Sequence, residues 1–248
     1  VRIRTPGQPE LLERLSLIEE GSHRRVRMAN LAVVGSHRVN GVAELHSDLL
    51  VRQLFRDFAD LWPDRFCNIT NGVTPRRWLA VANPGLAALF DEALGDRWRR
   101  DLEVLAELEP LLHDSGFLER WRQMRSVAKQ RLATTIQREL GVLVDHTSLF
   151  DVQVKRIHEY KRQLLNVIET VSLYQAIKAE PHRNWTPRVK IFGGKAASSY
   201  HNAKLIIKLA NDIARRVNSD PSVGGLLKVV FVPNYNVSLA EKIIPAAD

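Results

Sequence analysis

The amino-acid sequence predicts an α/β fold, with a parallel sheet in the second half of the chain and a mostly helical segment before it. Three short apolar runs carry this prediction, because each is followed by a helical pattern: residues 150–154, 189–192 and 229–232. Strands that alternate with helices form parallel sheets with right-handed crossovers, here a βαβαβ arrangement. Ligands of such sheets bind beyond the carboxyl ends of the strands.

The first part of the chain mixes helical and irregular signals. Residues 26–34 are mostly apolar and fit either a buried helix or a buried strand. Residues 44–58 predict an amphipathic helix, because apolar side chains recur at helical spacing: Leu45, Leu49, Leu54 and Phe58. The turn sequence Trp62-Pro63-Asp64 closes this helix.

A boundary between two domains is expected next, because two turn-forming pairs follow one another, Asn71-Gly72 and Thr74-Pro75. We therefore expect one part over residues 1–71 and another over residues 72–248. Beyond the boundary, helical patterns cover residues 84–94 and 117–140. The second pattern has the apolar stripe of a core-facing helix: Leu118, Trp121, Met124, Ala128, Leu132 and Ile136.

A helix is predicted after each of the three strands. The first has an apolar face made of Leu164, Ile168 and Val171. The second has a longer apolar face: Ile206, Ala210, Ile213 and Val217. Before the last helix, Ser238 precedes Glu241 by the spacing of a capping box, so Ser238 is expected to be its N-cap.

Composition excludes several classes of protein. Apolar residues make up 45% of the chain and charged residues 26%, as in an ordinary soluble globular protein. No apolar run approaches the roughly 20 residues of a membrane span, and residues 1–4 do not resemble a signal sequence. The single cysteine, Cys67, excludes an internal disulfide and is compatible with the cytoplasm. We expect a cytoplasmic protein without a membrane partner.

The formal net charge of +8 is compatible with an anionic partner or with a solvated basic surface. Basic residues are spread along the chain without a long block, and no RNA-recognition or zinc-finger pattern occurs. A nucleic-acid partner is therefore not expected. The eight histidines have no paired metal-ligand spacing, so no metal site is expected.

Basic and polar residues follow each predicted strand at its carboxyl end. After the first strand come four cations within eight residues: Lys155, Arg156, Lys161 and Arg162. Gly193-Gly194-Lys195 follows the second strand, and Asn234-Tyr235-Asn236 follows the third. These tips meet at one edge of the sheet, where cations and backbone amides suit a phosphate-bearing ligand. The alternative is a set of solvated charges.

Other ligand sites have less support. The segment Gly193-Gly194-Lys195 is not a Walker A loop, because Ala196 stands where Ser or Thr is required. No G-x-G-x-x-G sequence follows a strand, which counts against a dinucleotide site. No G-x-S-x-G sequence occurs, so a serine nucleophile has no support.

Five motifs resemble the α-glucan phosphorylase family. They are GSHRVNGVAELHS (Gly35–Ser47), TNGVTPRRW (Thr70–Trp78), FDVQVKRIHEYKRQLL (Phe150–Leu165), GGKAA (Gly193–Ala197) and VSLAEKIIPAAD (Val237–Asp248). These ordered matches are spread over nearly the whole chain. One departure is Ser198-Ser199, where the family often has Pro-Gly.

The resemblance implies a two-lobed, B-type glycosyltransferase fold with its active site between the lobes. Residues 1–71 would end the N-terminal catalytic lobe, and residues 72–248 would form the first half of a Rossmann-like C-terminal lobe. The implied reaction cleaves an α-1,4-glucan (glycogen, starch or maltodextrin) with inorganic phosphate and gives glucose 1-phosphate with retention. A homodimer and pyridoxal 5'-phosphate (PLP), which acts through its phosphate group, are implied as well.

The resemblance also implies roles for single residues. Lys155 would contact the PLP phosphate, and Arg156 and Lys161 would bind the substrate phosphate. These three residues are the catalytic candidates. Tyr200 and His158 would lie near the entrance of the site.

Two further pairs of residues are implied in binding. Trp78 and Tyr235 would lie against the cofactor, although Trp78 fits plain core packing equally well. Asn71 and the backbone near Val42 would contact the glucosyl unit of the substrate.

The family's Schiff-base lysine lies in a GTGNMK segment, which does not occur in this sequence. We therefore expect PLP in the intact enzyme and expect this chain alone to be inactive. Three alternatives stay open: a non-catalytic sugar- or phosphate-binding module, a basic nucleic-acid-binding domain and a nucleotide-sugar glucan synthase. The sequence KRIHEYKRQ counts against the last of these.

Overall fold

The computed structural model describes residues 7–248; Val1–Arg4, which bear on the expectation about a signal sequence, lie outside this range. The chain forms two compact units that divide between Val73 and Thr74. This division falls close to the expected boundary, and the assignment of each unit to a lobe stays a prediction. No helix within the described range is long and apolar enough to cross a membrane.

Short helices and two strand pairs build the described part of the first unit, residues 7–73. Its helices are α1 (Pro9–Leu15), α2 (Met28–Gly35), α3 (Glu44–Leu49) and α4 (Arg56–Leu61), with the helical turns η1 (Leu50–Leu54) and η2 (Pro63–Arg65). Strands β1 (Ile18–Glu19) and β2 (Arg25–Val26) pair antiparallel, and strands β3 (Val39–Gly41) and β4 (Phe66–Asn68) pair parallel. The apolar segment 26–34 is therefore helical from Met28 onward.

The single helix expected over residues 44–58 is wrong, because the helical run breaks at Phe55. The Phe55 amide donates to the Leu50 carbonyl (2.8 Å), which closes a wide turn before α4. After the break, α4 buries Phe58 in the core of the unit. The other apolar residues of the predicted face stay exposed: Leu45, Leu49 and Leu54.

The second unit begins with helices. They are η3 (Arg76–Val81), α5 (Pro84–Leu94), η4 (Arg97–Arg99), η5 (Leu102–His113) and α6 (Ser115–Leu140). The Asn83 side chain caps α5 by accepting from the Leu86 amide (3.3 Å), and Asp114 caps α6. The middle of the predicted stripe on α6 is buried: Ala128, Leu132 and Ile136. Trp121, in the same stripe, remains partly exposed.

The predicted parallel βαβαβ arrangement is confirmed. Strands β5 (Leu149–Val154), β6 (Arg188–Gly193) and β7 (Leu227–Val232) form one sheet in the order β5-β6-β7, and both pairings are parallel. The crossover helices are α7 (Gln163–Ala179) and α8 (His201–Asn218), and a short turn, η6 (Glu159–Lys161), precedes α7. After β7 come α9 (Val237–Ile243) and η7 (Ile244–Ala246).

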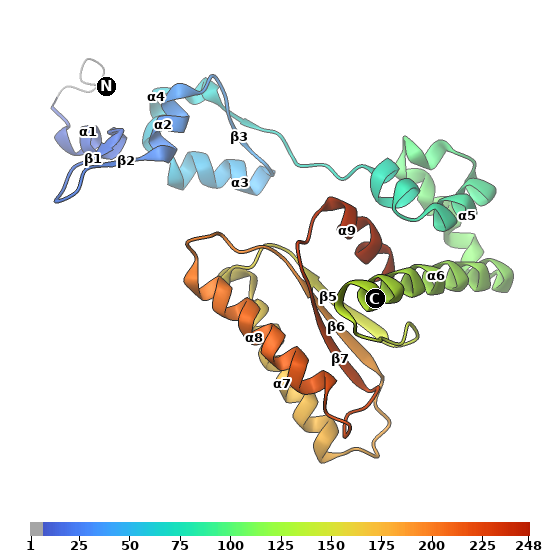
Figure 1. Ribbon diagram of the computed structural model, residues 1–248. Coiled ribbons are helices and arrows are strands. Elements are labelled where there is room, and N and C mark those ends of the chain that lie inside the picture. Colours follow the sequence, from blue (N-terminus) through green and yellow to red (C-terminus); the bar gives the residue numbers. More distant parts are fainter. Residues whose placement is uncertain (1–6) are drawn as a thin grey trace. The chain divides into compact units, whose positions relative to one another are not determined.

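Helices cover both faces of this sheet (Figure 1). On one face α7 and α8 pack against β6 and β7, around Val167, Ile177, Phe192, Ala214 and Leu227. On the other face α6 and α9 pack against the sheet, around Leu132, Phe150, Ile191, Val230 and Ile243. Both faces of the sheet are thus shielded from solvent, which explains why the strands are continuous apolar runs and do not alternate between apolar and polar residues.

The apolar face predicted for α7 is not the face that enters the core. Leu164 and Ile168 are 42% and 56% exposed, and Val171 is only half-buried. The buried face instead carries polar residues among its apolar ones: Gln163, Val167, Thr170, Tyr174 and Ile177. Hydrogen bonds satisfy those buried polar groups, so periodicity of apolar residues alone selects the wrong side.

The cap predicted for the last helix is also wrong. Asn236, not Ser238, is the N-cap of α9, and its side chain accepts from the Leu239 amide (3.0 Å). Glu241 makes no capping box, because its carboxylate accepts from Arg77 Nε (2.7 Å) and so ties η3 to α9. The asparagine lies one position before the helix and meets its free amides first.

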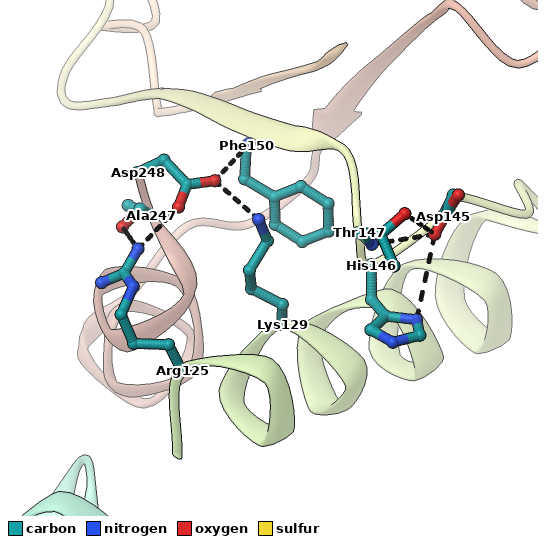
Figure 2. A network of polar contacts seen from close by, with 8 residues as sticks. All are labelled: Arg125, Lys129, Asp145, His146, Thr147, Phe150, Ala247 and Asp248. Carbon is teal, nitrogen blue, oxygen red and sulfur yellow. Dashed lines mark hydrogen bonds and ion pairs between the residues drawn. The ribbon is translucent and has the colours of Figure 1, made fainter. Parts of the chain in front are cut away.

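A cluster of charges joins residue 248 to the start of β5 (Figure 2). One oxygen of Asp248 accepts from Lys129 Nζ (2.7 Å) and from the Phe150 amide (2.8 Å). The other oxygen accepts from Arg125 Nη2 (2.6 Å). The Asp248 amide in turn donates to the Phe150 carbonyl (3.1 Å). This carboxylate therefore fastens the segment after α9 and η7 to α6 and to the first strand.

Candidate functional site

The three strand tips meet at one edge of the sheet, as expected for Lys155, Gly194 and Tyr235. The Lys155 amide donates to the Gly193 carbonyl (3.0 Å), which joins the ends of β5 and β6. A β carbon added to Gly193 would lie 3.8 Å from the Tyr235 Cβ, so the loop after β7 also reaches this point. Parallel strands in one register bring about this convergence.

Gly194 lets the two loops after β5 and β6 approach closely. A β carbon at this position would lie 2.0 Å from the Lys155 carbonyl oxygen, which is far inside van der Waals contact. One residue further along, the Ile157 amide donates to the Lys195 carbonyl (3.1 Å). Any side chain at Gly194 would therefore push apart the segments that carry the candidate cations.

The catalytic candidates Lys155, Arg156 and Lys161 all lie on the loop after β5. Lys155 and Lys161 line one cavity of about 490 Å³, and Arg156 is exposed beside it without lining it. Within residues 7–248, none of the three takes part in an ion pair. Their charges are therefore available to an anionic ligand.

Two carboxylates in the same cavity are already neutralised. Lys190 is 3% exposed at its side chain, and its Nζ lies 2.6 Å from Asp151 Oδ2 and 2.5 Å from Glu169 Oε2. Arg188 lies near the same two carboxylates, at 3.7 and 3.9 Å. These acids consequently do not compete with a ligand for Lys155 or Lys161.

Tyr200 and His158, expected near the entrance of the site, hold the loop after β5 against the start of α8. The Tyr200 hydroxyl donates to Glu159 Oε2 (2.5 Å) and accepts from the Glu159 amide (3.3 Å). The hydrogen bond from the Tyr200 hydroxyl to the Glu159 carboxylate lowers the pKa of Glu159, with a contribution from Asn202. The same hydrogen bond raises the pKa of Tyr200. The His158 ring lies between two rings, 4.3 Å from Tyr160 and 4.9 Å from Tyr200.

The two aromatic residues expected against a cofactor occupy different settings. Tyr235 is half-buried at the strand tips, and burial raises the pKa of its hydroxyl. Trp78 is half-buried in η3, which the Arg77–Glu241 ion pair attaches to α9. The contact between Trp78 and a cofactor stays a prediction, with core packing as its alternative.

The two candidates for sugar binding lie together in the first unit. The Asn71 amide donates to the Val42 carbonyl (3.0 Å), so both residues belong to the irregular chain that follows β3 and β4. The Val42 amide donates to His46 Nδ1 (3.0 Å). His46 therefore helps to fix the backbone at Val42. The spacing of histidines in the sequence does not indicate this role.

The donor set at the strand tips suits the phosphate end of PLP. Lys155 supplies a cation without an ion-pair partner in the described part of the chain, and Tyr235 supplies a half-buried ring. The GTGNMK segment, in which the resembled family carries its Schiff-base lysine, does not occur in this sequence. Across residues 7–248, histidine, cysteine and carboxylate side chains form no group of three that could hold a metal ion.

Comparisons with known proteins agree with these motifs. The family model described as carbohydrate phosphorylase matches residues 1–248. A glycogen phosphorylase of Haemophilus influenzae is 54% identical over 248 residues, and one of Synechocystis is 50% identical over 248 residues. The human liver form is 50% identical over 243 residues, which is 98% of this chain. The chain spans about 30% of the length of these relatives (30% and 29%).

Proposed function

The chain belongs to the carbohydrate phosphorylase family, and on this premise we propose that it is a segment of an enzyme that cleaves α-1,4-glucans with inorganic phosphate. The relatives that support this proposal are named glycogen phosphorylases. Glycogen, starch and maltodextrin are the candidate substrates, and glucose 1-phosphate is the product. We assign the intact enzyme to the cytoplasm and to a homodimer that contains PLP, on the resemblance alone.

One observation carries the proposal: the catalytic candidates Lys155, Arg156 and Lys161 have no ion-pair partner among the described residues and stand on the loop after β5, at the edge where ligands of parallel sheets bind. In the proposed site, Arg156 and Lys161 hold the substrate phosphate, and Lys155 faces the phosphate of PLP. PLP, when bound, supplies a second phosphate. Two phosphates repel one another, so a cluster of cations is needed to keep them close.

The proposed reaction is the one that the family resemblance implies. The substrate phosphate donates a proton to the glycosidic oxygen, the bond between that oxygen and C1 breaks, and a phosphate oxygen then bonds to C1. The products are glucose 1-phosphate and a glucan shortened by one unit, with the α configuration retained. Positive charge from Arg156 and Lys161 stabilises the phosphate as it gives up the proton.

The proposal is tested at Arg156 in the intact enzyme. Arg156→Ala removes a charge-assisted contact at the transition state, and the loss of one such contact costs about 10²–10³ in rate. Arg156→Lys keeps the charge but loses the planar fork that binds two oxygens, and we expect it to lose a good part of the same activity.

Initial rates of phosphorolysis against phosphate concentration measure both effects, and PLP content and far-UV circular dichroism serve as controls for the fold. A kcat and a KM for phosphate that stay near wild type in Arg156→Ala would show that Arg156 does not bind the phosphate.

A further inference from the structure

Gln163 is a buried polar residue at the beginning of α7, and both ends of its amide contact the loop after β5. The residue is 1% exposed. Its Nε2 donates to the Arg156 carbonyl (2.9 Å), and its Oε1 accepts from the His158 amide (3.3 Å). One side chain thus brackets Ile157 and satisfies the backbone on either side of it.

The loop needs this support because the strand ladder has already ended. The Lys155 amide still bonds to Gly193 of the neighbouring strand, and the Ile157 amide bonds to the next loop at Lys195. Between these bonds, the Arg156 carbonyl is bound by Gln163. The backbone of the residue that we assign to phosphate is therefore held from inside the protein by a single amide.

The local fold returns Gln163 to this point. Arg162 has a φ of 63°, a left-handed conformation that is uncommon outside glycine and asparagine. It stands between η6 and α7, directly before Gln163, whose side chain reaches the start of the loop. Buried side-chain amides are kept in proteins when both ends are bonded, as they are here.

We propose that Gln163 is a positioning residue of the phosphate site, which holds the Arg156 backbone so that the guanidinium points beyond the sheet edge. This inference rests on the function proposed above. Gln163 touches no substrate in it and acts through Arg156.

A matched control lies on the same helix. Thr170 is 0% exposed, and its hydroxyl donates to the Asn166 carbonyl (2.8 Å). Thr170→Val removes one buried hydrogen bond from α7 without touching the loop after β5. Any change that comes from loosening the helix in general is therefore seen in Thr170→Val as well.

The experiment compares phosphorolysis by the intact enzyme in two variants of Gln163. Gln163→Met keeps the length of the side chain and removes both hydrogen bonds. Gln163→Glu keeps an acceptor for the His158 amide and loses the donor to the Arg156 carbonyl, so it tests the bond to Arg156 alone. This variant also replaces Gln163→Met in the experiment if the methionine variant does not fold.

We expect the KM for inorganic phosphate to rise roughly tenfold in both variants, since the Arg156 carbonyl loses the hydrogen bond that holds this part of the loop in place. The KM for glucan should stay within about twofold, and Thr170→Val should match wild type in both constants. In the double variant Arg156→Ala with Gln163→Met, the second change should add little to the first, because both act through the same guanidinium.

Four outcomes separate the two hypotheses. If Arg156→Ala weakens the use of phosphate and both Gln163 variants behave like Thr170→Val, the positioning role is wrong and the proposed function stands. Full additivity in the double variant would also contradict a role through Arg156. If Arg156→Ala itself has no effect on the use of phosphate, the phosphate-binding role of Arg156 is wrong, and the inference from Gln163 is overturned with it. If the intact wild-type enzyme releases no glucose 1-phosphate from glucan and phosphate, the proposed function itself is wrong.

Discussion

Asp248 illustrates how a single carboxylate contributes to this fold. Three donors reach its two oxygens, from Arg125, Lys129 and the Phe150 amide (Figure 2). Burial by itself raises the pKa of Asp248, but the hydrogen bonds from Lys129, Phe150 and Arg125 outweigh it and leave the pKa below its ordinary value. The ionised form is therefore the one that the folded chain prefers.

This preference predicts a dependence of stability on pH. The pKa of Asp248 is lower in the folded chain than in the unfolded chain. Ionised Asp248 therefore contributes to the free energy of unfolding at pH values above the unfolded pKa, which is about 3.9. This contribution is lost as the pH falls through the lower folded value. Asp248→Asn should therefore lower the free energy of unfolding at pH 7. The variant should also lose less of its free energy of unfolding than the wild type does as the pH is lowered.

Urea unfolding of the chain at pH 7 and at several lower pH values measures both quantities. Asp96→Asn is the matched control, because Asp96 is exposed and makes no ion pair within residues 7–248. Parallel stability curves for wild type and Asp248→Asn across the acid range would contradict the assignment.

At the scale of an element, α7 shows that one helix can carry two apolar faces. Ile168 is 56% exposed, whereas Ile177, on the other side of the helix, is 1% exposed and packs under the sheet. The same substitution at the two positions therefore compares the faces directly. We expect Ile177→Ala to cost about 2–5 kcal/mol, as for other buried isoleucines.

Ile168→Ala is expected to change the free energy of unfolding by no more than about 0.5 kcal/mol in this chain, as for other surface positions. Denaturant unfolding of both variants measures the difference. Equal losses at the two positions would mean that the face made of Leu164, Ile168 and Val171 is packed in solution.

The loop after β5 is a second element whose form depends on its neighbours. Gly194 leaves room for the Lys155 carbonyl, Tyr200 binds Glu159, and Gln163 binds the backbone on both sides of Ile157. Each partner comes from a different element, namely the loop after β6, the start of α8 and the start of α7. Convergence of these elements gives the loop a defined conformation without a strand partner.

At the scale of the whole molecule, the chain has two compact units and about 30% of the length of its relatives. The second unit carries the cations that we propose to bind phosphate, and the GTGNMK segment in which the resembled family has its Schiff-base lysine does not occur in this sequence. We therefore expect the purified chain to release no glucose 1-phosphate from maltoheptaose and phosphate, with or without added PLP.

A coupled assay for glucose 1-phosphate tests this expectation, with the intact enzyme as the positive control. Far-UV circular dichroism establishes that the chain is folded under the assay conditions. Phosphate-dependent product from the folded chain would show that the missing lysine is dispensable or replaced.

Much of the second unit could be predicted from the sequence alone. The three strands, their parallel order and the convergence of Lys155, Gly194 and Tyr235 follow from local patterns, because a strand buried on both faces is apolar throughout. The beginning of α5 follows from Pro84 and its asparagine cap in the same way. Ordered motifs also determine the family, since several long matches in sequence order leave little room for chance.

Tertiary structure decided the features that depend on residues far apart in the chain. Asp248 accepts a hydrogen bond from the Phe150 amide, 98 positions away in the sequence. Glu241 pairs with Arg77, 164 positions away, instead of forming a capping box. Hydrogen bonds from other elements also favour the buried side of α7, because Gln163 and Tyr174 find partners there that a pattern of apolar residues does not reveal. Local sequence determines periodicity, whereas the satisfaction of buried polar groups depends on which elements meet.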